Sequence, residues 1–74
     1  MSRNKRRNAV DFAESFIETE IFENAWGSTP EELLSDMLDL ADLQGVEIVN
    51  LDLFDYEQFF TDANNEMKDL IMYG

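Results

Sequence analysis

The chain has 74 residues and a formal net charge of −12, because seventeen acidic side chains stand against five basic ones. A chain of this length is expected to form one small domain. Histidine and cysteine are both absent, which excludes disulfides, thiolate metal sites, histidine general bases and cysteine nucleophiles.

The composition favours a folded protein over a disordered acidic tail. Hydrophobic residues make up 45% of the chain, and six Phe, one Trp and two Tyr are available for a core. The basic start is not followed by the apolar run of a signal peptide, and no stretch approaches the length of a membrane span. We therefore expect a cytoplasmic protein that makes no membrane contact.

The charges are strongly segregated along the chain. Four of the five bases lie in residues 1–7, and Lys68 is the fifth, so residues 8–74 carry one base against seventeen acids, a charge of −16. This predicts a flexible basic arm over 1–7 and a single acidic domain over 8–74. Four charges give little affinity for nucleic acid at physiological salt, and the acidic domain repels phosphates. We expect the arm to fold back on acids of the protein or to stay disordered.

The first expected helix covers about residues 9–24. Asn8 can cap it, and apolar side chains then recur every three and four residues. The pattern changes phase near Thr19 and Glu20, so the helix either continues with a second apolar face or breaks there. The alternation in IETEI also permits a short strand. The sequence therefore leaves three alternatives for residues 17–26: a helix, a strand or a bend.

The second expected helix covers about residues 30–43. Thr29 can cap it, Pro30 suits the first helical position, and Glu32 completes a capping box. Gly45 fits the left-handed residue beyond the helix end.

Residues 46–53 are extended in character, since Val46 and Ile48 alternate with polar residues. A single strand cannot satisfy its own backbone. It can pair with the IETEI segment or with a second copy of the chain, or it can be buried as a linker.

The third expected helix covers about residues 55–73. Asp55 can cap it, and Phe54 can pack on Phe59 as a hydrophobic staple. The predicted fold class is therefore mainly α, with three amphipathic helices and one short extended segment that can pair as a strand.

The residue types argue against an enzyme. No glycine-rich phosphate loop is present, the acids do not follow the spacing of an EF-hand, and a pair of catalytic carboxylates would need a deeper cleft than this chain can build. We expect no catalytic residue, no metal site and no cofactor.

The acids of the three helices recur at three- and four-residue spacing with almost no base between them. Each such like-charge pair costs a few tenths of a kcal/mol of helix stability. That so many are present indicates that the negative electrostatic field of the acids has a function. Duplex DNA carries about one charge per 1.7 Å, so −16 corresponds to about 27 Å of duplex. The acids predicted to imitate phosphates are Asp11, Glu14, Glu18, Glu32, Asp36, Asp39, Asp62, Glu66 and Asp69.

In size, charge and the lack of histidine and cysteine, the chain resembles the small acidic DNA-mimic inhibitors made by bacteriophages. This resemblance implies an inhibitor used in host takeover, acting in the bacterial cytoplasm. Its partner would be a basic DNA-binding protein of the host, such as a nucleoid-associated protein or a nuclease, for which it competes with nucleic acid without binding nucleic acid itself. The acids of two copies can combine in a homodimer.

The alternative hypothesis is a small helical protein–protein interaction module. Phe22 and Trp26 fall outside the apolar stripe of the first helix, and aromatic side chains are common at the centres of interfaces. In this reading the two aromatics contact the partner and the acidic faces are merely solvated. Against it, aromatic side chains of so small a protein usually fill the core.

Overall fold

The computed structural model describes residues 5–73. Four α-helices, a two-stranded parallel sheet and one 3-10 turn form this part of the chain, which confirms the mainly α fold class. In chain order the elements are β1 (Lys5–Asn8), α1 (Ala9–Phe16), α2 (Glu20–Ala25), α3 (Pro30–Gln44), β2 (Val46–Val49), the 3-10 turn η1 (Leu51–Leu53) and α4 (Tyr56–Tyr73).

The helix expected over 9–24 is divided in two by a break at residues 17–19. The hydroxyl of Thr19 donates a hydrogen bond of 2.6 Å to the carbonyl oxygen of Phe16 and accepts one of 3.4 Å from the N–H of Phe22. One side chain thus helps to end α1 and caps α2, as threonine does at helix starts. Of the alternatives for residues 17–26, the break is therefore confirmed and the strand is wrong.

The extended segment 46–53 forms β2 in its first half and η1 in its second. The partner of β2 is β1, in parallel register from Lys5 opposite Val46 to Asn8 opposite Val49. The segment therefore pairs as a strand, as expected, but the pairing with the IETEI segment is wrong. Of the two expectations for the arm, disorder is wrong for residues 5–7, and folding back onto an acid of the chain is confirmed for Arg6, which pairs with Glu47. Backbone groups of β2 need partners, and residues 9–45 supply the long crossover that a parallel pair requires. Residues 1–4 of the expected arm lie outside the described residues.

The two later helices begin at the caps that the sequence predicts. Thr29 Oγ1 accepts a 3.3 Å hydrogen bond from the N–H of Glu32 at the start of α3, and Gly45 adopts the left-handed conformation (φ 69°) beyond its end. At the start of α4, Asp55 Oδ1 accepts a 3.2 Å hydrogen bond from the N–H of Gln58. The Phe54 and Phe59 rings lie 5.4 Å apart, as a hydrophobic staple requires.

The hydrophobic core joins all four helices. The ring of Phe16 lies 6.0 Å from those of both Phe22 and Phe60, with edge-to-face geometry in each case, an arrangement that aromatic pairs favour. The buried core residues are Ala9, Phe12, Ala13, Phe16, Phe22, Leu33, Met37, Ala41, Phe54, Phe60 and Ala63.

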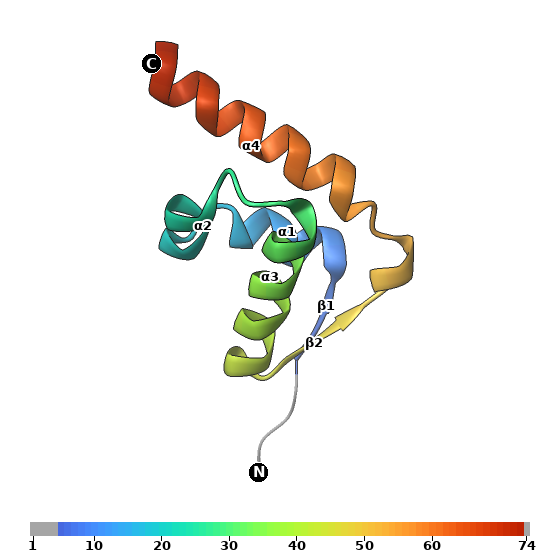
Figure 1. The fold of residues 1–74 in the computed structure, drawn as a ribbon. Coiled ribbons are helices and arrows are strands. Elements are labelled where there is room, and N and C mark those ends of the chain that lie inside the picture. The colour runs from blue at the N-terminus through green and yellow to red at the C-terminus, as the bar shows by residue number, and fades with distance from the viewer. Residues whose placement is uncertain (1–4, 74) are drawn as a thin grey trace.

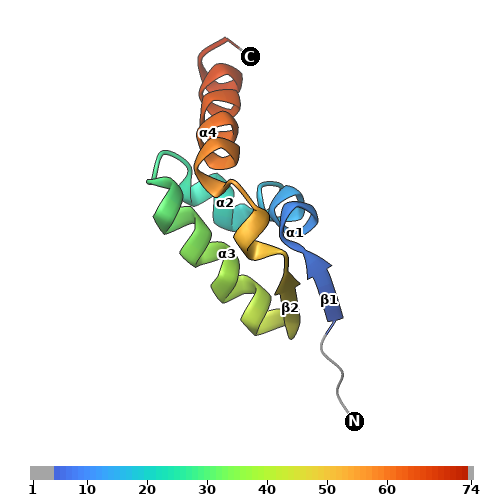
Figure 2. The ribbon, with the colours of Figure 1, turned by 90° about the vertical axis from the view of Figure 1, so that its right-hand side faces the viewer.

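Helix α4 lies across the other helices, and its last turns extend beyond them (Figures 1 and 2). Asn64 attaches it to the loop between α2 and α3. Its Oδ1 accepts a 3.0 Å hydrogen bond from the N–H of Gly27, and its Nδ2 donates a 3.2 Å hydrogen bond to the carbonyl oxygen of Ser28. The strands β1 and β2 lie at the opposite end of the molecule from the last turns of α4 (Figure 2).

Candidate functional site

The acidic side chains form an almost uncompensated surface. Sixteen of the seventeen are exposed, and Asp36 is half-buried. Within residues 5–73 the one ion pair joins Arg6 to Glu47, at 3.8 Å between Arg6 Nε and Glu47 Oε1. The surface therefore presents carboxylates that no basic side chain of the described residues neutralises by direct contact.

Some of these acids have a local structural reason to be where they are. Acids in the first turn of an α-helix are stabilised by the positive end of the helix dipole. Six lie in such positions, and two of them, Asp11 and Glu32, were predicted as phosphate mimics; the six are Asp11, Glu20, Glu23, Glu31, Glu32 and Glu57. The seven other predicted mimics occupy no such position: Glu14, Glu18, Asp36, Asp39, Asp62, Glu66 and Asp69.

The predicted acids divide among three parts of the fold. Asp11 and Glu14 lie on α1, and Glu18 lies in the turn that follows it. A second set on α3 consists of Glu32, Asp36 and Asp39, and a third set on α4 consists of Asp62, Glu66 and Asp69. Only this third set, Asp62, Glu66 and Asp69, lines the hollows of the surface described next. The structure thus joins three of the nine acids to a concave feature.

This concave feature, here called the trough, runs along one side of α4. It consists of three adjoining hollows of about 460, 180 and 100 Å³, and Glu66 lines all three. Ile17 and Ala63 line both of the smaller hollows, and Leu70 lines the largest and the smallest. The lining residues are Ile17, Phe22, Phe59, Asp62, Ala63, Glu66, Met67, Asp69, Leu70 and Tyr73.

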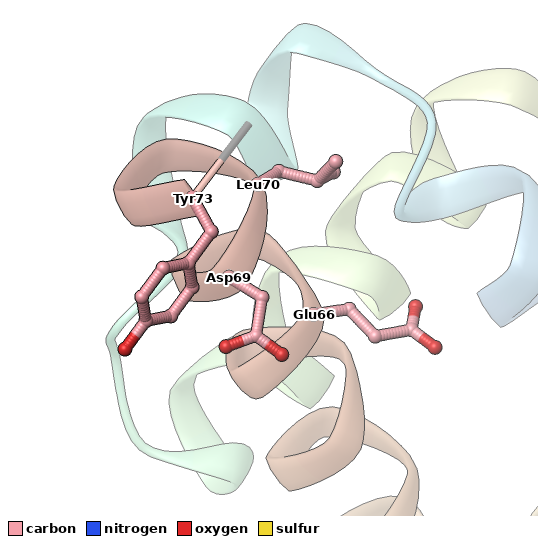
Figure 3. A pocket seen from close by; sticks show the side chains of 4 residues that line it. All are labelled: Glu66, Asp69, Leu70 and Tyr73. Carbon is pink, nitrogen blue, oxygen red and sulfur yellow. The ribbon is translucent and has the colours of Figure 1, made fainter.

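The largest hollow is lined by α4 alone. Glu66, Asp69, Leu70 and Tyr73 project from two successive turns of the helix (Figure 3). Leu70 is 67% exposed and Tyr73 is 82% exposed. Apolar side chains on this part of α4 therefore meet solvent, beside two carboxylates.

The apolar contact predicted from Phe22 and Trp26 is not formed as expected. Phe22 is only 2% exposed and belongs to the core, while Trp26 is half-buried against it. The break at Thr19 changes the direction of the chain, so that the Phe22 ring packs on Phe16 in the core. Phe22 is therefore a core residue and not the exposed anchor that the alternative hypothesis expects, although it also lines the smallest of the three hollows.

The trough was not predicted from the sequence, although one signal for it is present. Residues 70–73 read LIMY, four apolar residues in succession. Such a run surrounds the helix, whereas an amphipathic helix needs apolar residues on one face only. All four are more than half exposed, so the excess of apolar surface lies where no other element of the described residues covers it.

The basic side chains of β1 make contacts within the chain. The guanidinium carbon of Arg7 lies 5.7 Å from the centre of the Phe12 ring, and Arg7 Nη2 donates a 3.3 Å hydrogen bond to Ser15 Oγ. Arg6 pairs with Glu47. Two of the four N-terminal bases thus contact other elements of the chain: Arg7 contacts α1 and Arg6 contacts β2.

Comparisons with protein-family models, curated proteins and solved structures find no match to this chain. No helix within residues 5–73 combines the length and the apolar character needed to cross a membrane. The same residues contain no cluster of three acids placed to hold a metal ion.

Proposed function

We propose that this protein is a DNA-mimic inhibitor, which binds a basic DNA-binding protein of a bacterial host and competes with nucleic acid for it. The observation that carries the proposal is the exposure of sixteen of seventeen acids with one ion pair among residues 5–73. A surface of this kind attracts a basic surface and repels nucleic acid.

The arrangement of the acids supports a contact made by several elements. Seven of the predicted mimics lie outside the first turns of the helices, so helix-dipole stabilisation does not account for them. They are distributed over α1 with its following turn, α3 and α4, as a broad electrostatic footprint requires. Complementary charge of this extent makes association fast and salt-sensitive.

The test is capture from a nuclease-treated bacterial lysate on the immobilised chain, with elution first by duplex DNA and then by salt. The control variant replaces Glu14, Glu18, Asp36, Asp39, Asp62, Glu66 and Asp69 by Gln or Asn, which preserves side-chain shape and changes the formal charge from −12 to −5. Its circular dichroism spectrum should match that of the native chain.

We expect DNA-binding proteins on the native chain, released by the duplex and absent from the variant. Retained proteins that do not bind DNA, or that the duplex does not displace, would contradict the proposed function.

A further inference from the structure

The apolar stripe with which α4 faces the core continues beyond the core. Phe60 and Ala63 are buried and Met67 is half-buried, but residues 68–73 are all exposed, and four of these six are apolar. At 1.5 Å per residue, the exposed stretch is about 9 Å long. Apolar surface bordered by polar side chains is typical of interaction sites.

The position of the trough indicates a helical occupant. Its lining follows α4 from Phe59 to Tyr73 and includes Ile17 from the turn after α1. Fourteen residue steps of α-helix measure about 21 Å, or four turns. A shallow surface of this length, in which seven of the ten lining side chains are apolar and the Tyr73 end is formed by α4 alone, suits the apolar face of an amphipathic helix.

The negative charge around the trough favours an occupant that carries positive charge. Asp62, Glu66 and Asp69 line it, and no basic side chain within residues 5–73 does. Lys68 lies on another face, since two residues of helix turn through about 200° from Glu66. A second copy of this chain would bring its own acids against these three, and like charges in an interface are unfavourable.

We propose that the trough binds an amphipathic helix of the partner protein, with apolar side chains on the inserted face and Lys or Arg along its flanks. The inference deepens the proposed function and depends on it for the expectation of a basic partner. It differs in assigning the contact to the trough, whereas the proposed function requires only the acidic surface.

The probe is a labelled 18-residue helical peptide with leucines at i, i+3, i+4 and i+7 spacing and lysines elsewhere, titrated against the full chain by fluorescence anisotropy. A second peptide has the same composition with its leucines distributed around the helix. We expect the patterned peptide to bind about tenfold more tightly than the second peptide. Burial of one leucine side chain in an apolar contact is enough to change the affinity roughly ten- to hundredfold.

Variants locate the contact. Leu70→Ala and Tyr73→Ala should each weaken the patterned peptide by about tenfold. The matched variants Leu43→Ala and Leu53→Ala remove equally exposed leucines outside the trough (83% and 79% exposed) and should leave binding unchanged. All four residues are exposed, so circular dichroism should report the same folded structure in each variant.

A charge pair of variants completes the test. Glu66→Gln should weaken the patterned peptide a few-fold and reduce the dependence of its affinity on salt. Asp39→Asn, on α3 and outside the trough, should change affinity much less, because the screening length at physiological salt is about 8 Å.

Two results would overturn the inference. In one, the variants outside the trough weaken binding as much as those within it. In the other, the native chain sediments as a dimer that Leu70→Ala dissociates, which assigns the trough to a second copy. Either result leaves the proposed function standing if duplex DNA still releases captured DNA-binding proteins. Failure of that capture with the trough variants behaving as expected would contradict the proposed function alone.

Discussion

Arg6 and Glu47 lie opposite each other across the parallel strands β1 and β2, with Arg6 Nε 3.8 Å from Glu47 Oε1. Their side chains are 76% and 52% exposed, and an exposed pair of this kind contributes a few tenths of a kcal/mol, roughly. The basic strand is therefore held mainly by its backbone pairing and by Arg7. Within residues 5–73 the acidic side chains of the helices form no ion pair.

Arg7→Ala should lower the free energy of unfolding by about 1 kcal/mol, because it removes the contact with the Phe12 ring and the hydrogen bond to Ser15. Arg6→Ala removes the same charge from the neighbouring residue and should cost about half as much or less. Urea unfolding followed by Trp26 fluorescence measures both. Equal effects would mean that only net charge matters at these positions.

Asn64→Ala should lower the free energy of unfolding by about 1–2 kcal/mol. The substitution removes both hydrogen bonds that join α4 to the loop at Gly27 and Ser28. Asn65→Ala is the control, because Asn65 is the exposed neighbour on the same helix. Thermal unfolding followed by circular dichroism compares the two, and a control as unstable as Asn64→Ala would contradict the role assigned to this side chain.

Phe22→Ala should destabilise the chain by about 3–5 kcal/mol, since it leaves a cavity beside Phe16 in the core. That loss is comparable to the whole stability of many small domains, so the variant is expected to be largely unfolded at 25 °C. Ile21→Ala, at a partly exposed neighbouring position, should remain folded. A folded Phe22→Ala that has lost only partner binding would instead support a direct contact.

The melting temperature of the native chain should rise by several degrees between about 10 and 300 mM NaCl, because salt screens the repulsion among its acids. The variant with seven acids neutralised should show a smaller rise and a higher melting temperature at low salt. Differential scanning calorimetry measures both chains. A melting temperature independent of salt would show that the acids are compensated already.

The starts of α3 and α4 could be predicted because their signals are local. Thr29 and Asp55 each accept a hydrogen bond from an N–H three residues later, and Gly45 takes the left-handed conformation that a helix end favours. These interactions are formed by residues adjacent along the chain, so residue type and spacing were sufficient to place them.

The pairing of β1 with β2 could not be predicted in this way. Lys5 and Val46 are opposite each other although forty-one positions separate them, and a run of basic residues does not have the alternation of a strand. The location of Phe22 also depended on tertiary contacts. The sequence showed a change of phase near Thr19, but the core contact with Phe16 decided that Phe22 is buried.

The sequence by itself determined the charge of this protein, the side-chain chemistry that it lacks and the caps of its longer helices, because these depend on residue type and short-range spacing. Only the tertiary structure decided that three of the acids border an apolar trough and that Leu70 and Tyr73 are exposed within it. The physical reason is that exposure depends on where the neighbouring helices end. The apolar stripe of α4 is longer than the body that covers it.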